Sequence, residues 1–382
     1  MAFGKPRSRI SPIGIDFGAD SLKLLQIVPG EPGELVALGA TAVPEEARTD
    51  YRARQEFLAD ALPSLLRRHP FKNRRVMLST PASQTLVNNL LIGRGDPRDL
   101  NGQVDMALRE RLGIEPSRMV IRNFPACEVF RDSRPMQEVI TFAAGRDIIM
   151  RYVELMNRLK LEVDGMHCEA SCTLSAFKHL GGSGAAAGRE AVVAYVDLGA
   201  ATSKFIVARG QTMLLAKTVH AGGDQRIKAA ATQQKIGFAE ARLARLAELS
   251  GQAAGPASVG RSAATATAVA PASGRGSAIG GEADDETTDQ LIDELRMTFR
   301  HHDSRHPDAP ITKLVFIGGE ANHRGVCQAL ARAVNVPAQL GDPLARLSRI
   351  NAEPSAAGGV DLSQPQPGWA VALGLCLSDA NL

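Results

Sequence analysis

The sequence contains no apolar run that approaches the roughly 18 residues needed to cross a membrane. Its first ten residues, MAFGKPRSRI, also lack the apolar core of a secretory signal peptide. These two absences predict a chain that has no membrane span of its own and is located in the cytoplasm.

Cysteine is scarce, with 5 residues in 382, an odd number that includes no CxxC pair. This pattern excludes a disulfide framework and predicts reduced thiols, most of them packed in the interior. His167, Cys168 and Cys172 lie close together, but zinc usually takes four ligands and no second pair stands at suitable spacing. We therefore interpret these three residues as core packing rather than as a metal site.

A second cluster of metal-ligating residue types, His301, His302 and His306, falls where a helix is predicted to end. Cationic side chains are favoured at a helix C-terminus. We expect these three histidines to be solvated there, and we prefer this interpretation to a metal site.

Concentrated positive charge is also absent, since 44 basic residues face 41 acidic ones and the net charge is +3. Nucleic acid is therefore not expected as a partner. No GxxxxGK[ST] motif is present, which excludes a P-loop protein. Residues 181–190 match a GxGxxA dinucleotide pattern, but they precede a predicted strand instead of following one, so we interpret them as a linker.

The length allows two domains, and the hydrophobic pattern predicts two strand meanders that begin near residues 13 and 192. Between them, a compact α/β unit of four strands and two helices interrupts the first domain. A capping-box pair, Thr287 and Gln290, predicts the start of a late helix, and GWAVALGLCL predicts a final apolar one. The predicted divisions are 1–81 and 189–382 for the two domains, 82–168 for the inserted unit, 169–188 for a return helix and hinge, 224–309 for a helical subdomain, and 251–284 for a mobile low-complexity segment within it.

One short turn occurs twice, as IDFGADSLKL at 15–24 and as VDLGAATSKF at 196–205. The two copies align Asp16 with Asp197, and each carries Gly, a hydroxyl residue and Lys at the same spacing. A glycine turn brings backbone N–H groups close to a phosphate, and a hydroxyl adds a donor. The aspartates suit the water shell of Mg²⁺. With Gly318-Gly319 ending a third apolar strand, the pattern predicts two hairpins that hold the phosphates of one nucleotide.

These residues resemble the actin-like ATPase superfamily. GIDFGADSLKLLQI is similar to its first phosphate motif, YVDLGAATSKFIVARG to its second, and LVFIGGEANHRGVCQALARAVNVP to its adenosine motif. Within the superfamily, the stretches HAGGDQRIKAA and GWAVALGLCL resemble the PilM family of type IV pilus assembly. The resemblance implies an α/β actin-like fold, in which two ribonuclease-H-like domains surround a nucleotide cleft and the first domain carries a small α/β insertion.

The resemblance also implies a role for particular residues toward ATP and Mg²⁺. Asp16 and Asp197 would hold the metal, and Glu169 would be the catalytic, water-polarising residue. The other implied residues all bind the nucleotide, and they are Gly18, Ala19, Ser21, Lys23, Gly199, Ala200 and Thr202 at the phosphates, Gly222 and Gly223 at the phosphate or sugar, and Glu240, Gly318, Gly319 and Glu320 at the adenosine.

Four positions depart from the family pattern. Asp20 stands where relatives commonly have Ser, and its carboxylate would repel phosphate. Arg242 and Arg245 follow Glu240 where relatives usually show Lys, and Glu320 replaces a small residue. ATP binding with at most slow hydrolysis is therefore expected, and a pseudo-ATPase scaffold remains an alternative. A small-molecule kinase is a weaker one, because no Asp of the first domain has the context of a catalytic base.

The resemblance implies that the inserted unit binds a partner, namely the N-terminal cytoplasmic tail of a PilN-like inner-membrane protein. That partner would bring the chain to the inner membrane, in a type IV pilus or a related type II secretion system. Self-association is compatible with each of these functions.

Overall fold

The computed structural model describes residues 10–93, 99–180, 190–253, 267–268, 281–348 and 356–381. Most of the predicted low-complexity segment 251–284 and residues 181–188 of the predicted hinge lie outside these ranges. The chain divides into two compact units, each built from separate stretches of sequence. The first contains residues 1–80, 151–176 and 343–382, and the second contains residues 81–150 and 177–342.

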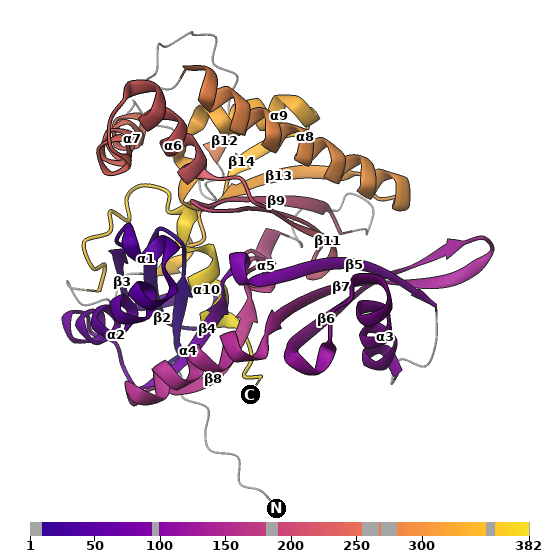
Figure 1. Cartoon of the computed structure of the whole chain (residues 1–382), viewed down its shortest axis with the longest axis horizontal. Helices are drawn as coiled ribbons and strands as arrows, with labels where there is room; N and C mark the ends of the chain where they lie inside the picture. Colours follow the sequence, from indigo (N-terminus) through magenta and orange to yellow (C-terminus); the bar gives the residue numbers. More distant parts are fainter. Residues whose placement is uncertain are drawn as a thin grey trace, which may run out of the picture. The chain divides into compact units, whose positions relative to one another are not determined.

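The first unit is built on a six-stranded mixed sheet (Figure 1). β1, β2 and β3 form the predicted antiparallel meander, and β4 and β8 lie parallel to β1 on its other side. In spatial order the strands are β15 (Leu347–Ser348), β3 (Gly33–Ala42), β2 (Ser21–Val28), β1 (Ile13–Phe17), β4 (Arg75–Thr80) and β8 (Glu162–Cys168).

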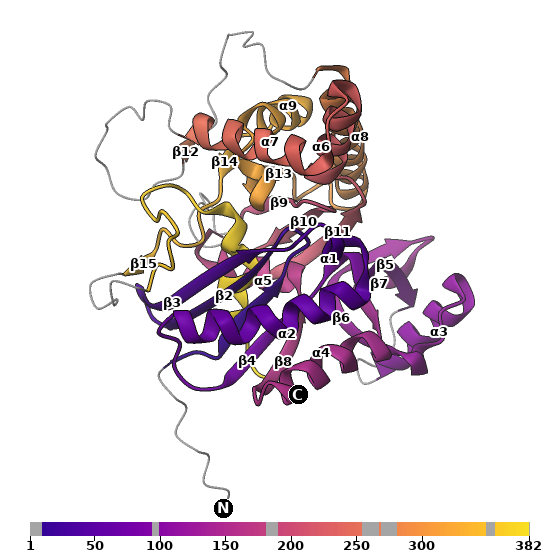
Figure 2. The same ribbon diagram turned by 60° about the vertical axis from the view of Figure 1, so that its left-hand side comes forward.

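Helices pack on both faces of this sheet. As a result, its central strands β1 and β4 are buried on both sides. Phe17 contacts Tyr152 of α4, with ring centroids 4.6 Å apart. On the opposite face Gly14 lies against α10, where an added Cβ would come within 2.6 Å of the Ala372 carbonyl. Figure 2 shows α2 crossing in front of the sheet. The helices are α1 (Glu46–Thr49), α2 (Tyr51–Arg68), α4 (Arg146–Arg158), α5 (Glu169–Ala176) and α10 (Ala370–Leu377).

The sheet of the second unit repeats the same scheme. An antiparallel meander, β9 to β11, continues through the parallel strands β13 and β14. In order the strands are β11 (Thr212–Val219), β10 (Ser203–Arg209), β9 (Val192–Leu198), β13 (Ile311–Ile317), β14 (Ala338–Leu340) and β12 (Thr267–Ala268). The helices are α6 (Gly223–Gln234), α7 (Phe238–Ala253), α8 (Gly281–Arg305) and α9 (Arg324–Val334).

The inserted segment forms a three-stranded antiparallel sheet that clusters with the second unit. Its strands are β5 (Thr85–Gly93), β7 (Arg134–Gly145) and β6 (Met119–Arg131), and α3 (Leu100–Leu112) packs beside β5. Asn89 attaches this sheet to β11. Its Nδ2 donates to the Ala216 carbonyl (2.8 Å) and its Oδ1 accepts from the Ala216 N–H (3.3 Å).

Several sequence expectations differ from this arrangement. The fourth strand expected in the inserted unit, β8, pairs with β4 of the first sheet, so the inserted sheet has three strands among the described residues. The C-terminal stretch from Pro343 belongs to the first unit, although we expected it in the second domain. Thr287 does not cap α8; it is buried within a helix that begins at Gly281.

The structure agrees with the expected core packing of the two cysteines of the first cluster, but not with the expected exposure of the whole second cluster, His301, His302 and His306. Cys168 and Cys172 are buried, as expected for core packing, and all five cysteines are free thiols. The second cluster is not uniformly solvated. His302 is fully buried and bonds the Ala309 carbonyl through Nε2 at 2.7 Å, while His301 is exposed.

Among the described residues, no helix has both the length and the apolar character to cross a bilayer.

Candidate functional site

The first repeated turn joins β1 to β2 at the centre of the first sheet. Asp16 is buried and pairs across the hairpin with Lys23, whose Nζ lies 3.9 Å from Asp16 Oδ2. Ser79, from the end of β4, donates to Asp16 Oδ1 at 3.4 Å and accepts from the Phe17 N–H at 3.1 Å. An added Cβ on Gly18 would come within 2.7 Å of the Ser21 carbonyl, so the tight turn requires glycine there.

Two arginines support this turn. Arg54 of α2 donates to the carbonyls of Phe17 (2.9 Å) and Gly18 (3.0 Å). Arg48 of α1 forms an ion pair with Asp20, and its side chain is buried. The carboxylate expected to repel phosphate therefore has a cation beside it, which reduces the repulsion.

The second repeated turn joins β9 to β10 in the second unit and has the same register. Asp197 pairs with Lys204, and here the Lys Nζ lies 2.9 Å from Asp197 Oδ2. Both side chains are largely buried. The Gly199 N–H donates to the Thr202 carbonyl at 3.1 Å, so this N–H is used inside the turn and is not directed at a ligand.

Gly222 and Gly223 lie directly against this turn. The N–H groups of Gly223 and Asp224 donate to the carbonyls of Gly199 (3.1 Å) and Ala200 (2.8 Å). An added Cβ on Gly222 would come within 2.6 Å of the Gly199 carbonyl. Only glycine allows this approach, which explains why α6 begins with a Gly-Gly pair.

Gly318, at the end of β13, packs against the same turn from the neighbouring strand. Its φ is +91°, and an added Cβ would overlap both the Leu198 carbonyl and Asp197 Oδ1. Gly319, which begins a 3₁₀ turn over Gly319–Asn322, has no such restriction. The second unit therefore gathers Asp197, Gly199, Gly222 and Gly318 in one place. That these residues bind a nucleotide stays a prediction.

Glu320 adds a buried ion cluster to this group. Its Oε2 accepts from Arg226 of α6 at 2.6 Å and from Arg245 of α7 at 3.0 Å. Burial raises the pKa of this carboxyl, but the charges of the two arginines lower it more, so the net shift is downward from 4.5. The Glu320 side chain also occupies the space that a Cβ on Gly223 would need.

Glu169 is the first residue of α5 in the first unit, and it is buried rather than solvated. Burial raises the pKa of the Cys172 thiol well above its usual value, and the charges of Glu169 and Asp16 add to this shift. Glu169 and Asp16 are both buried in the first unit, and a catalytic role of Glu169 stays a prediction.

Some site residues were not foreseen from the sequence. Ser79, Arg48, Arg54 and Arg226 all contact the turns or the adenosine motif, yet none lies in a repeated pattern. Of these four, only Arg226 lies in a stretch, HAGGDQRIKAA, that the family resemblance had singled out. Glu240 is exposed on α7, and it is Arg245 of that helix that reaches Glu320.

Two sheets of one topology, each opening with an Asp-x-Gly hairpin, define the actin-like ATPase fold. The structure superposes with a TM-score of 0.74 on a chain described as part of a PilM-PilN type IV pilus biogenesis complex, at 18% identity, over 97% of this chain and 98% of that one. The model of the family "Type IV pilus assembly protein PilM" matches residues 14–252. The chain belongs to this PilM family.

Other solved structures are similar to a lesser degree. The ethanolamine utilization protein EutJ from Carboxydothermus hydrogenoformans gives a TM-score of 0.46 at 12% identity, over 98% of this chain and 90% of that one. An archaeal actin homologue in complex with ADP gives 0.43 at 11% identity, over 96% and 98%. A search of curated proteins gave no match.

Proposed function

We propose that this chain binds ATP with Mg²⁺ as part of type IV pilus assembly. The observation that carries the proposal is the matched pair of hairpins, in which each unit presents a buried Asp, a turn glycine, a hydroxyl residue and a Lys in the same register. When bound, Mg²⁺ supplies positive charge that neutralises phosphate oxygens.

The residues present fit such a ligand. Gly222 and Gly318 let backbone pack directly against the second turn, at places where any Cβ would collide, and so fix the position of Asp197 and of the turn. Asp16 and Asp197 would hold the metal through its waters. Ser21 and Thr202 would donate to phosphate oxygens, and Lys23 would contribute a positive charge.

A scaffold that binds nucleotide without turnover is a second candidate function. Lys204 already forms a 2.9 Å ion pair with Asp197, so a metal would compete with this cation for the carboxylate. That competition favours weak Mg²⁺ binding and slow hydrolysis.

Thermal unfolding with and without Mg-ATP tests nucleotide binding. A ligand at about 100 times its Kd stabilises the native state by about 2.7 kcal/mol, so the wild type should unfold at a higher temperature with Mg-ATP. Asp197→Ala should lose this response, whereas Asp289→Ala, an exposed aspartate on α8, should keep it. If wild type does not respond at millimolar ATP, the nucleotide proposal is wrong. Phosphate release by the wild type then separates an ATPase from a scaffold.

We also propose that the inserted sheet binds the N-terminal cytoplasmic tail of a PilN-like inner-membrane protein, which would bring the chain to that membrane. The support is the family and the similarity to a chain from a PilM-PilN complex. The inserted sheet also exposes large apolar side chains, with Phe130 of β6 77% and Leu86 of β5 50% exposed. Exposed aromatic side chains such as Phe130 are enriched in protein interfaces, which makes this residue the one to test.

Fluorescence anisotropy with a labelled peptide tests this proposal, using the N-terminal tail of the PilN-like protein from the same organism. The wild type should bind this peptide and not a scrambled one. Phe130→Ser should weaken binding at least tenfold, while Leu243→Ser, equally exposed on α7, should not. Equal binding by the two variants would show that the partner does not bind at Phe130 of the inserted sheet.

A further inference from the structure

Three side chains with metal-binding atoms converge in the second unit, away from the repeated turns. Cys127 Sγ lies 3.2 Å from Glu138 Oε2 and 3.6 Å from His306 Nε2, and the latter two atoms are 3.0 Å apart. All three donor atoms lie within 4.8 Å of one another. They come from β6, from β7 and from the residue that follows α8.

A β-bulge brings the first two residues together. Pro125 pairs with Val139 and Glu128 with Gln137, so Ala126 and Cys127 both stand opposite Glu138. The Gln137 side chain donates to the carbonyls of Cys127 (3.1 Å) and Glu138 (3.0 Å). Bulges redirect side chains and are frequent beside functional sites.

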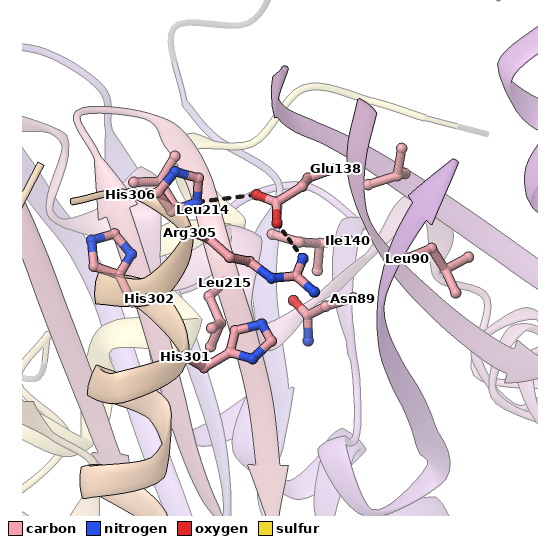
Figure 3. Close-up of a pocket in the computed structure, with 11 residues that line it drawn as sticks. Asn89, Leu90, Glu138, Ile140, Leu214, Leu215, His301, His302, Arg305 and His306 are labelled. Atoms are coloured by element: carbon pink, nitrogen blue, oxygen red, sulfur yellow. Dashed lines mark hydrogen bonds and ion pairs between the residues drawn. The ribbon is translucent and has the colours of Figure 1, made fainter. Parts of the chain in front are cut away.

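The third residue is fixed by the end of α8. The His306 N–H donates to the His302 carbonyl at 2.8 Å, and the His306 carbonyl accepts from the Ala309 N–H at 3.0 Å. Figure 3 shows His306 and Arg305 both directed at Glu138. Arg305 binds the other carboxylate oxygen, Oε1, which leaves Oε2 to Cys127 and His306.

The distances match those expected around a tetrahedral zinc ion. With Zn–S near 2.3 Å and Zn–N and Zn–O near 2.1 Å, the ligand atoms of such a site lie about 3.4 to 3.6 Å apart. The observed separations of 3.0, 3.2 and 3.6 Å require outward movement of a few tenths of an ångström at most. Thiolate, imidazole and carboxylate are also the three ligand types that zinc accepts.

The surroundings can complete a four-ligand site. Glu138, Arg305, His306, His301 and His302 line a small pocket with room for about one water molecule (Figure 3). Within the described residues, Nδ1 of the buried His302 has no hydrogen-bond partner. Arg305 pairs with Glu138, and the charges of Arg305 and Arg209 both favour the thiolate form of Cys127 that a metal ion requires.

We propose that Cys127, Glu138 and His306 bind a zinc ion, with a water from the adjoining pocket as fourth ligand. The metal replaces the thiol proton of Cys127, which leaves to solvent as the Zn–S bond forms. The ion would connect the inserted sheet to the end of α8 within the second unit. Without metal, the same residues form only the polar contacts described above.

Metal analysis of the full-length protein tests this proposal. After expression with zinc and dialysis without chelator, the wild type should retain about one zinc per chain. His301→Gln is the matched control, because His301 lines the same pocket but lies outside the ligand group, and it should retain the metal. Cys127→Ser and His306→Gln should bind zinc at least 10- to 100-fold more weakly.

Substitution of cobalt for zinc detects coordination of the metal by the Cys127 thiolate. Cobalt-loaded wild type should show a thiolate-to-cobalt charge-transfer band together with the visible bands of a tetrahedral ion, and Cys127→Ser should lose the charge-transfer band. Circular dichroism of the metal-free variants separates loss of metal from loss of fold. A wild type that retains no zinc and gives no charge-transfer band would overturn the proposal, as would a Cys127→Ser protein that keeps both.

Discussion

Lys204 Nζ lies 2.9 Å from Asp197 Oδ2, whereas the equivalent atoms of Lys23 and Asp16 are 3.9 Å apart. The two hairpins share a residue pattern and a register, and their surroundings differ. Ser79 donates a hydrogen bond to Asp16 in the first unit, whereas Gly318 packs against Asp197 in the second.

The unequal ion pairs predict unequal losses of stability. Lys204→Ala leaves a buried carboxylate without its cation and should lower the free energy of unfolding by about 3 kcal/mol. Lys23→Ala removes a longer pair, and Ser79 still donates to Asp16, so the loss should be smaller, about 1 to 2 kcal/mol. Urea denaturation of both variants measures the difference. Equal losses would show that the separation of the charges does not set their contribution.

Gly318→Ala should be destabilising, while its neighbour Gly319→Ala should be close to neutral. At Gly318 the positive φ and the overlap with Leu198 and Asp197 together should cost more than about 2 kcal/mol. At Gly319 an added Cβ meets no atom within 4 Å, and a change within about 0.5 kcal/mol is expected. Thermal unfolding of the pair tests this. A stable Gly318→Ala protein would mean that β13 can shift away from the second turn.

Glu320 should make stability depend on acid. Its pKa is lowered in the folded state, so its contribution to stability is fully present above its ordinary value of 4.5 and is lost as pH falls through the folded value. Glu320→Gln should lower the free energy of unfolding by about 3 kcal/mol near neutral pH, because Arg226 and Arg245 lose their counter-charge. The free energy of unfolding of this variant should also decrease less steeply than that of the wild type as pH falls below about 4.5.

Denaturation curves from pH 3 to 7 are expected to show both effects. Glu286→Gln, at an exposed position on α8, serves as the control and should leave the wild-type pH profile unchanged. A Glu320→Gln protein with that same profile would contradict the prediction.

Asn89→Ala should loosen the inserted sheet from β11. The substitution removes two hydrogen bonds to the Ala216 backbone and should cost about 1 to 3 kcal/mol. Amide exchange should accelerate around Ala216. The adjacent Asn88 side chain makes no hydrogen bond through Nδ2 to any described residue, so Asn88→Ala should leave exchange in β11 unchanged. Faster exchange in both variants would argue against a specific role for Asn89.

Local patterns predicted much of the fold. The two predicted meanders form where expected and begin at β1 (Ile13–Phe17) and β9 (Val192–Leu198), because short apolar runs are encoded within each segment. The repeated turn predicted two strand–turn–strand hairpins, and β1–β2 and β9–β10 form them in the same register. In both cases the relevant signal lies within a few neighbouring residues.

Long-range pairings were not predictable in the same way. Nothing in the stretch LEVDGM states that β8 pairs with β4 rather than with the inserted sheet. The ion pairs of Glu320 join residues 75 and 94 positions apart, and the Cys127–His306 contact spans 179. Such contacts depend on how whole elements pack, and a single sequence does not record this.

The position of α10 has a consequence for how the protein is made. Gly374 packs directly on Cys172, and Cys376 donates to the Leu25 carbonyl at 3.1 Å, so this helix completes a core begun by β1 and β2. A ribosome delivers those strands hundreds of residues before it delivers the helix, although nascent domains generally fold as units from the N-terminus. The second unit is fully synthesised first. The first unit must wait, its central sheet uncovered on one face, until residues 370–377 emerge.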